Sequence, residues 1–221
     1  MSRVFAIGDL HGCRNTFEHI LTEEIKIKRS DKIYCLGDYV GRGPNAKGVI
    51  DYILKLRKKG YAIHTLRGNH EALLLDAVKD AEKQKLWLSN GGEATLESFG
   101  IKSLKRLPEK YEEFLKRTKF YIATSENVFV HAGLNFSIPD PFTDKRAMLW
   151  TREPLFIYHK IQRRILVHGH TPISIAQLHS QPSIHKINID TGCVYKSRIG
   201  CGHLTAVELP SKEFISVRNI D

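Results

Sequence analysis

Five segments of the sequence end an apolar run with a glycine-containing turn that carries side chains able to bind a metal ion. In chain order, these side chains are Asp9 and His11, then Asp38, then Asn69, His70 and Glu71, then His131, and finally His168 and His170. Glycine permits the backbone conformations that tight turns need. Carboxylate, imidazole and amide groups without a thiolate suit Mn²⁺, Fe or Zn²⁺. More than four such ligands predict two ions that share a carboxylate and activate a water molecule, which is the chemistry of a two-metal hydrolase.

Each of these signals is weak when it is taken alone. A lone Gly-Asp, such as the one at Asp9 or Asp38, is typical of a turn. Single histidines inside expected strands, such as His64 and His179, are commonly packed or exposed, and we expect neither to bind metal. Five clusters in succession rarely arise by chance, so the ordered set carries the prediction.

The elements that would position these groups follow from the hydrophobic pattern. Through the first eighty residues, short β-rich runs alternate with helical patterns three times, which predicts a parallel sheet with crossover helices. Residues from about 80 to 118 read as a helical segment bordering the site, and from residue 119 onward the pattern predicts strands. Because no repeat, low-complexity tract or linker divides the chain, we expect one α/β domain over residues 1–221.

Composition narrows the protein class. The 221 residues are 42% hydrophobic and 26% charged, as in soluble globular proteins. No apolar run approaches the length of a membrane span, and the N-terminal run leads directly into a motif, so we expect a cytoplasmic protein without a signal peptide. The four cysteines form no CxxC pair and are expected as reduced thiols. The net charge of +10 suits anionic partners in general.

The motifs GDLHG, GDYVGRGP, GNHE, HAG and GHTP, in this order, resemble those of the metallophosphoesterases, and within them the phosphoprotein phosphatase branch. The chain is similar to small bacterial serine/threonine phosphatases and to lambda phage phosphatase over residues 3 to about 209, with residues 80–130 contributing little. This resemblance implies a four-layer α/β sandwich: two mixed β-sheets flanked by helices, with a dimetal site at the carboxyl ends of the strands.

The resemblance also implies which residues hold two divalent ions, with Mn²⁺ expected and Fe or Zn²⁺ as alternatives. By their places in the motifs, the first ion takes Asp9 and His11, the second takes Asn69, His131 and His170, and both share Asp38. His168 lies just before the ligand position. It is expected either behind the ligands, where it would orient them, or simply in the core.

Two arginines are candidates to bind the substrate phosphate. The planar fork of Arg42 suits phosphate oxygens, and Asn69 would contact the phosphate as well. Arg152, in the segment WTRE, resembles a second phosphate-binding arginine of the bacterial group. A surface ion pair of Arg152 with Glu153 or Asp144 is an equal alternative.

In the mechanism that the resemblance implies, a bridging hydroxide attacks phosphorus in line, without a covalent intermediate. Both ions and Arg42 stabilise the charge on the equatorial oxygens. His70 protonates the leaving alkoxide, whose own pKa is too high for unaided departure.

Gly41 departs from the phosphatase motif GDxVDRG, in which an acid at this position orients the catalytic histidine. His70 would therefore lack its usual partner, and Asp190 in NIDTG is a candidate replacement. If the missing acid were the only difference, Gly41→Asp would raise turnover of alkyl phosphoesters more than that of aryl esters or anhydrides.

The same departure bears on the substrate. Symmetrical diadenosine tetraphosphate hydrolases read GDLVARG, with a small residue at this place, and the segment DTGC also resembles them. Their nucleotide leaving group departs with less help from an acid. They are longer, however, and read GNHD where this chain has GNHE. From the sequence we expect a serine/threonine protein phosphatase, with a symmetrical bis(5'-nucleosyl)-tetraphosphatase as the alternative.

Two further hypotheses are weaker. A non-catalytic phosphate-binding protein would explain Gly41, but all six ligand positions and Arg42 are present. A nucleic-acid phosphodiesterase would fit the positive charge, and no nucleic-acid-binding signature accompanies it. We therefore expect a phosphorylated protein or a small phosphoester or nucleotide as the partner, and neither a membrane nor a nucleic acid.

Overall fold

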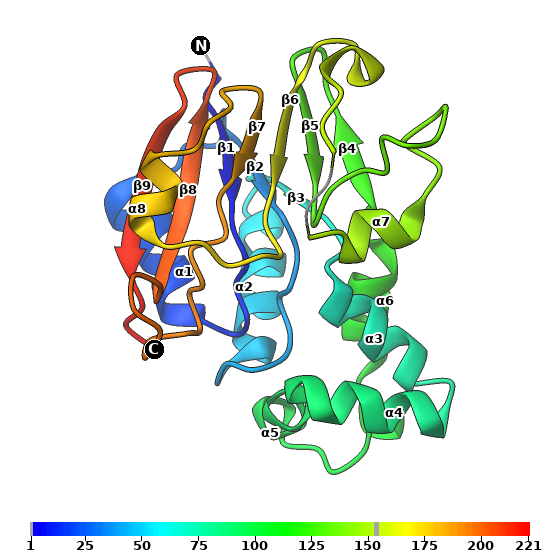
Figure 1. The fold of residues 1–221 in the computed structure, drawn as a ribbon. Helices are drawn as coiled ribbons and strands as arrows, with labels where there is room; N and C mark the ends of the chain where they lie inside the picture. The colour runs from blue at the N-terminus through cyan, green and yellow to red at the C-terminus, as the bar shows by residue number, and fades with distance from the viewer. Residues whose placement is uncertain (1, 153–154) are drawn as a thin grey trace.

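The structure is a computed structural model that describes residues 2–152 and 155–221. Its strands form two sheets, as predicted (Figure 1). Across the first sheet the order is β3 (Ala62–Thr65), β2 (Lys32–Cys35), β1 (Val4–Ile7), β8 (His203–Leu209) and β9 (Glu213–Arg218). Across the second it is β4 (Tyr121–Ala123), β5 (Asn127–Val130), β6 (Ile165–His168) and β7 (Lys186–Asn188).

Both sheets are mixed. In the first, β1, β2 and β3 are parallel, whereas β8 and β9 join antiparallel; in the second, β5, β6 and β7 are parallel and β4 is antiparallel. The predicted metal-binding motifs follow five of these parallel strands, β1, β2, β3, β5 and β6. Because parallel strands end at the same edge of a sheet, their carboxyl ends bring the motifs together.

The two sheets pack face to face through apolar side chains. Tyr34 of β2 stacks on Phe129 of β5 with ring centroids 4.0 Å apart and an interplanar angle of 9°. Ala6, Val167 and Val207 belong to the same buried cluster. Burial of these groups stabilises the sandwich by about 25 cal/mol per Å² of apolar surface.

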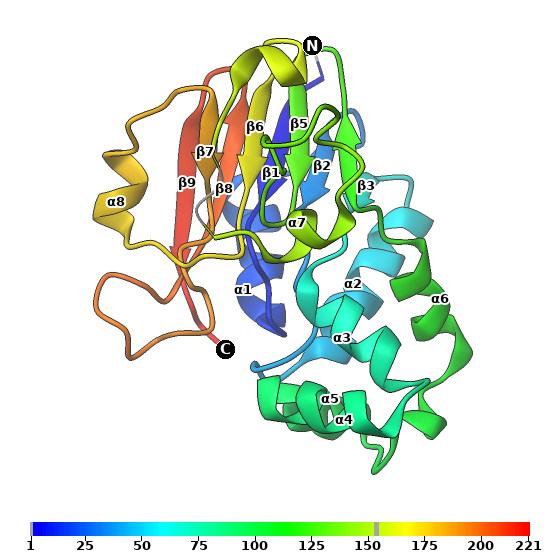
Figure 2. The same ribbon diagram turned by 45° about the vertical axis from the view of Figure 1, so that its right-hand side comes forward.

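Helices cover the outer faces of both sheets, which gives the expected four layers (Figure 2). The helices before residue 80 are α1 (Arg14–His19), continued by a π-helical turn (Ile20–Glu24), α2 (Ala46–Lys58) and α3 (Asn69–Ala77). After residue 120 they are α7 (Lys145–Trp150), a 3₁₀ turn (Tyr158–Ile161) and α8 (Ile175–His179). Met148 of α7 packs against the buried face of β5 and β6.

The segment from 80 to 118 is helical, as the sequence predicts. It contains α4 (Ala81–Trp87), a π-helical turn (Leu88–Gly92), α5 (Glu93–Phe99), a 3₁₀ turn (Leu104–Arg106) and α6 (Glu109–Arg117). α4 and α5 lie beyond one end of the sheets (Figures 1 and 2). Helix α5 ends at Gly100, whose φ of 64° is the left-handed conformation that a helix end favours in glycine.

Two further observations concern the cysteines and the apolarity of the helices. Its four cysteines are buried as free thiols. Among the described residues, none of the helices combines the length and the apolarity that crossing a membrane requires.

Candidate metal centre

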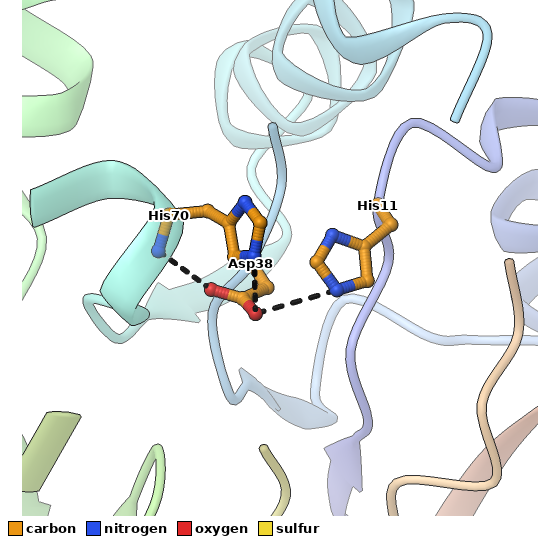
Figure 3. Close-up of side chains that lie close together, drawn as sticks. All are labelled: His11, Asp38 and His70. Carbon is orange, nitrogen blue, oxygen red and sulfur yellow. Dashed lines mark hydrogen bonds and ion pairs between the residues drawn. The ribbon is translucent and has the colours of Figure 1, made fainter. Parts of the chain in front are cut away.

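The five strand-end motifs converge on one buried place. Asp38 lies at its centre, between the imidazoles of His11 and His70 (Figure 3). The residues predicted to bind two ions are each at most 8% exposed; they are Asp9, His11, Asp38, Asn69, His131 and His170. They follow β1, β2, β3, β5 and β6, so the motifs arrive from five different strands.

Asp38 is shared by two groups of possible ligands. One group contains His11, Asp38 and His70, and the other contains Asp38, His131 and His170; within each, the candidate ligand atoms lie within 4.8 Å of one another. Oδ2 of Asp38 is 3.4 Å from Nε2 of His11, and Oδ1 is 3.6 Å from Nε2 of His131. Asp38 is therefore the residue common to both groups.

The backbone is strained at the residues that face the centre. His11, Asp38, Arg42 and His170 have φ values of 41°, 51°, 67° and 70°, in the left-handed region that side chains disfavour. Such strain costs on the order of 1–3 kcal/mol per residue and is characteristic of functional sites.

Two of the histidines are held in a metal-binding tautomer. Nδ1 of His131 is 3.0 Å from the carbonyl oxygen of Leu36, and Nδ1 of His11 is 3.2 Å from that of Val40. A carbonyl can only accept, so each Nδ1 carries the proton and each Nε2 presents a lone pair to the centre. Arg42, which can only donate, lies 2.7 Å from Nε2 of His11 and supports the same tautomer.

The remaining polar contacts fit a cation. Oδ1 of Asn69 lies 3.0 Å from Nε2 of His131, which carries no proton in this tautomer, so two acceptor atoms face each other; the same oxygen lies 3.0 Å from Nδ1 of His170. Oδ1 of Asp9 and Nε2 of His170 are buried without a hydrogen-bond partner among the described residues. Buried polar atoms are normally paired, and a divalent ion would give partners to the facing acceptors of Asn69 and His131 and to Oδ1 of Asp9.

The pKa values of the buried acids and histidines also fit a site for a cation. Burial raises the pKa of Asp38 to about 7, and burial with the nearby Asp190 and Asp38 raises the pKa of Asp9 well above its usual value. Burial also lowers the pKa of His11, His131 and His170 to about 3. Neutral imidazoles are the ligand form, and a bound cation would relieve the repulsion between the carboxylates.

Gly41 is packed directly against His70. A Cβ at position 41, where φ is 82°, would lie 2.4 Å from Nδ1 of His70. Both ring nitrogens of His70 lack a hydrogen-bond partner among the described residues, and burial together with His11 and Arg42 lowers the pKa of His70. The imidazole therefore occupies the space of the missing acid, and its surroundings favour the neutral form.

Asp190, the candidate replacement for that acid, makes its contacts elsewhere. It accepts a hydrogen bond from the amide of Gly192 at 2.9 Å and lies near Asp9, and no hydrogen bond joins it to His70 in the described chain. An Asp190–His70 pair therefore stays a prediction. Burial raises the pKa of Asp190 to about 7, and its position makes it a neighbour of the ligands.

Glu71 is a structural member of the site that the motif analysis left without a role. Its carboxylate is fully buried and accepts hydrogen bonds from the amides of Asp38, Tyr39 and Val40 at 2.8, 2.8 and 3.1 Å, and from Gly68 at 2.8 Å. These bonds fix the loop that carries Asp38. The only signal in the sequence was the acid at the fourth position of GNHE.

The helical segment also contacts the site. The hydroxyl of Thr95 accepts a hydrogen bond from the amide of Gly41 at 2.8 Å, and the carbonyl of Gly91 accepts one from the amide of Arg42 at 3.1 Å. The ring of Tyr195 lies 5.5 Å from the Arg42 guanidinium. The loop that carries Arg42 is therefore held from two sides.

The remaining candidates lie near the edge of the centre. Arg152 is exposed, and its charge contributes to the lowered pKa of His170 after burial and His131. Asp144 instead accepts a hydrogen bond from the amide of Ala147, and Glu153 lies outside the described residues. His168 is buried at the end of β6 and belongs to neither ligand group, as expected for a residue behind the ligands or in the core.

The fold and centre agree with the comparisons. The family model described as "Calcineurin-like phosphoesterase" matches residues 2–203, and the chain belongs to this family of metal-dependent phosphoester hydrolases. An asymmetrical bis(5'-nucleosyl)-tetraphosphatase, PrpE, of Oceanobacillus iheyensis is 29% identical, covering 97% of this chain and 92% of that protein. Serine/threonine-protein phosphatase 1 of Salmonella typhimurium is 34% identical over 41% of this chain and 39% of its own length.

Among solved structures, a serine/threonine phosphatase from Saccharomyces cerevisiae has a TM-score of 0.68 at 15% identity, covering 100% of this chain and 81% of that one. The likeness shows a shared fold. It supports the metallophosphatase sandwich predicted from the motifs.

Proposed function

We propose that the protein is a bis(5'-nucleosyl)-tetraphosphatase, which hydrolyses a phosphoanhydride of a dinucleoside polyphosphate. The contact between Gly41 and His70 carries this proposal. Nε2 of His70 lies 4.0 Å from Oδ2 of Asp38, and among the described residues its ring makes no hydrogen bond to an acid. A neutral histidine in this setting is a weak proton donor, so the site suits a leaving group that needs little protonation. A nucleotide phosphate is such a leaving group, whereas a serine alkoxide is not.

The similarity to a tetraphosphatase along nearly the whole chain supports the same choice, because the similarity to a protein phosphatase covers less than half of either protein. Both observations favour the nucleotide alternative over the protein phosphatase that the motifs alone led us to expect. Because the relative matched along its length is asymmetrical, we propose cleavage to a nucleoside triphosphate and a nucleoside monophosphate rather than to two diphosphates.

The proposed ligand roles are those that the sequence motifs imply. Asp38, which is common to both groups of possible ligands, would be shared by two ions, with Asp9 and His11 on one side and Asn69, His131 and His170 on the other. When bound, divalent ions supply a nucleophile at neutral pH and stabilise charge on phosphate oxygens. The metal is proposed as Mn²⁺, with Fe or Zn²⁺ as alternatives that the same ligands suit.

The side chains around the centre would then bind and orient the substrate. Arg42 presents its guanidinium at the centre, 2.7 Å from Nε2 of His11, where it would bind the oxygens of the attacked phosphate. Asn69 and Arg152 are further candidates for phosphate contact. His70 would lie beside the leaving oxygen as a neutral group, so that it orients the substrate more than it donates a proton.

The test compares kcat/KM on diadenosine tetraphosphate, a phosphoserine peptide and p-nitrophenyl phosphate with Mn²⁺ present. We expect a clear preference for the dinucleotide, with ATP and AMP as products. Two ADP molecules would retain the substrate class and exclude the asymmetrical reaction. A preference for the phosphopeptide would refute the proposal and restore the protein phosphatase.

A further inference from the structure

A cavity of about 490 Å³ lies beside the metal centre, among α3, α6 and α7. The three helices are seen together in Figure 2. Trp150, the last residue of α7, lines the cavity and is also in edge-on contact with His170, with ring centroids 6.2 Å apart. The cavity is therefore separated from a proposed metal ligand by the thickness of one side chain, and its volume is typical of a small-molecule site.

The cavity is strongly basic. Five cationic side chains line it against one carboxylate, that of Asp76; the cations are Arg67, Lys79, Lys116, Lys145 and Arg146. Asp76 already pairs with Lys83 at 3.3 Å, which lies outside the lining, and Lys116 pairs with Glu112. Within the described parts of the chain, no ion pair to a carboxylate is found for the other four cations.

Arg67 is held in place by hydrogen bonds to neutral groups, and Glu71 is the acid whose charge acts on it. Its guanidinium donates to the carbonyl oxygens of Leu115 and Lys116 at 3.2 and 2.8 Å and to the hydroxyl of Thr118 at 3.1 Å, all of them neutral acceptors. It also lies 4.9 Å from the ring centroid of Phe120. Lys145 makes a similar contact, since its Nζ lies 5.2 Å from the centroid of the same Phe120 ring.

The cavity also offers apolar and aromatic surface. Leu73 and Leu149 line it, and Trp150 is 40% exposed, which is unusual for so large an apolar side chain. A flat aromatic side chain beside cations provides stacking for a base and charge for phosphates. A purely apolar peptide segment would leave the four unpaired cations unused.

We propose that this cavity binds the nucleotide on the far side of the scissile phosphoanhydride, with its phosphates on the cations and its base against Trp150. This inference rests on the proposed function, because it assigns the part of the substrate that the metal centre does not hold. The chain of phosphates would pass Trp150 from the centre into the cavity. The ligand class is thus a nucleoside phosphate, and Lys79, Lys145, Arg146 and Trp150 set its affinity.

The kinetic test uses two double variants with the same change of charge. Lys79→Glu with Arg146→Glu reverses two exposed cations of the cavity. The control is Lys58→Glu with Arg29→Glu. Both residues are exposed, and they precede β3 and β2, so they lie near the amino ends of these strands, away from the metal centre at the carboxyl ends. Each is assayed on diadenosine tetraphosphate and on p-nitrophenyl phosphate, which is too small to reach the cavity.

We expect the cavity variant to lower kcat/KM for the dinucleotide by at least about tenfold, an effect that loss of charge complementarity readily produces. Its kcat/KM for p-nitrophenyl phosphate should change less than about twofold, and the control should change neither by more than this. Equal losses for the two double variants, or equal losses on both substrates, would overturn the inference. A wild-type enzyme active on the ester and inactive on the dinucleotide would instead refute the proposed function.

A binding measurement without catalysis tests the nucleotide-binding cavity separately from the proposed tetraphosphatase activity. The chain has two tryptophans, and Trp87 is fully buried, so quenching of tryptophan fluorescence by ADP in EDTA reports on Trp150. We expect ADP to quench the wild type and the control, to bind the cavity variant at least about tenfold more weakly, and to produce no signal in Trp150→Phe. Absence of quenching in the wild type, or equal affinity in both double variants, would overturn the inference whichever substrate is cleaved.

Discussion

Gly41 and His70 are in such close contact that a Cβ on residue 41 would lie 2.4 Å from Nδ1 of the histidine. His70 is fully buried, so its ring cannot swing out into solvent to avoid a side chain at position 41. This contact reverses an expectation drawn from the sequence. An acid introduced at position 41 would displace His70 before it could orient it, so Gly41→Asp should lower turnover of every substrate class.

The simplest test of this contact is Gly41→Ala. We expect kcat on diadenosine tetraphosphate to fall by at least about tenfold, because the methyl group moves a side chain beside the reacting atoms. Gly60→Ala is the matched control, since Gly60 has a φ of 87° and nothing within 4 Å of an added Cβ. Both variants carry the backbone strain of about 1–2 kcal/mol, and activity close to wild type in Gly41→Ala would contradict the contact.

Glu71 should contribute more to folding than to chemistry. We expect Glu71→Gln to reduce the free energy of unfolding by about 2–4 kcal/mol, because each carboxylate oxygen accepts from two buried backbone amides, so two of the four amides would meet the NH₂ group of glutamine instead of an acceptor. Urea denaturation measures this. Glu82→Gln, whose side chain is 79% exposed, should change stability by less than about 0.5 kcal/mol. Equal effects of the two substitutions would contradict the role of Glu71.

The sequence could predict the strands and the convergence of the motifs for one reason. Each predicted metal-binding residue lies in a glycine-containing turn after an apolar run. Because parallel strands end at the same edge of a sheet, this local sequence pattern was enough to predict that the residues meet in the folded chain. Asp38 and His131 are examples: their motifs are far apart in the chain, yet Oδ1 and Nε2 lie 3.6 Å apart.

The features that could not be predicted depend on contacts without a side-chain signal. Glu71 binds backbone amides of residues 38–40, and any residue there would offer the same amides. The clash at Gly41 depends on the rotamer of His70. The segment NTFEHILTEEI, residues 15–25, has apolar positions at helical spacing, and the structure changes from α-helical to π-helical hydrogen bonding at Ile20, which this spacing does not reveal.

Removal of the bridging carboxylate should separate metal binding from folding. In EDTA we expect Asp38→Asn to be at least as stable as the wild type, because it relieves repulsion with the buried Asp9. With Mn²⁺ at one hundred times its Kd, the wild type should gain about 2.7 kcal/mol, and the variant should gain much less and show no metal-dependent turnover. Thermal unfolding with and without the ion measures this, and an equal gain in the two proteins would remove Asp38 from the ligand set.

The ion pair between Arg3 and Asp31 should make part of the stability depend on pH. Nε and one Nη of Arg3 bind the Asp31 carboxylate at 3.3 and 2.7 Å, and the amide of Lys28 adds a bond at 2.8 Å. Burial opposes ionisation of Asp31, but these three bonds outweigh it and lower its pKa. A carboxyl whose pKa is lower in the folded state stabilises the fold at pH values above its unfolded pKa of about 3.9, and this contribution is lost as pH falls through the folded pKa.

Asp31→Asn should therefore cost about 1–3 kcal/mol at pH 7 and progressively less in acid, because the protonated aspartic acid and the asparagine that replaces it are then both neutral. Denaturation of the two proteins between pH 7 and the acid limit of folding measures the difference. Glu126→Gln is the control, since Glu126 is exposed and should leave the pH profile unchanged. A cost for Asp31→Asn that stays constant down to the lowest pH would mean that the carboxylate's charge is not what stabilises this end of β1.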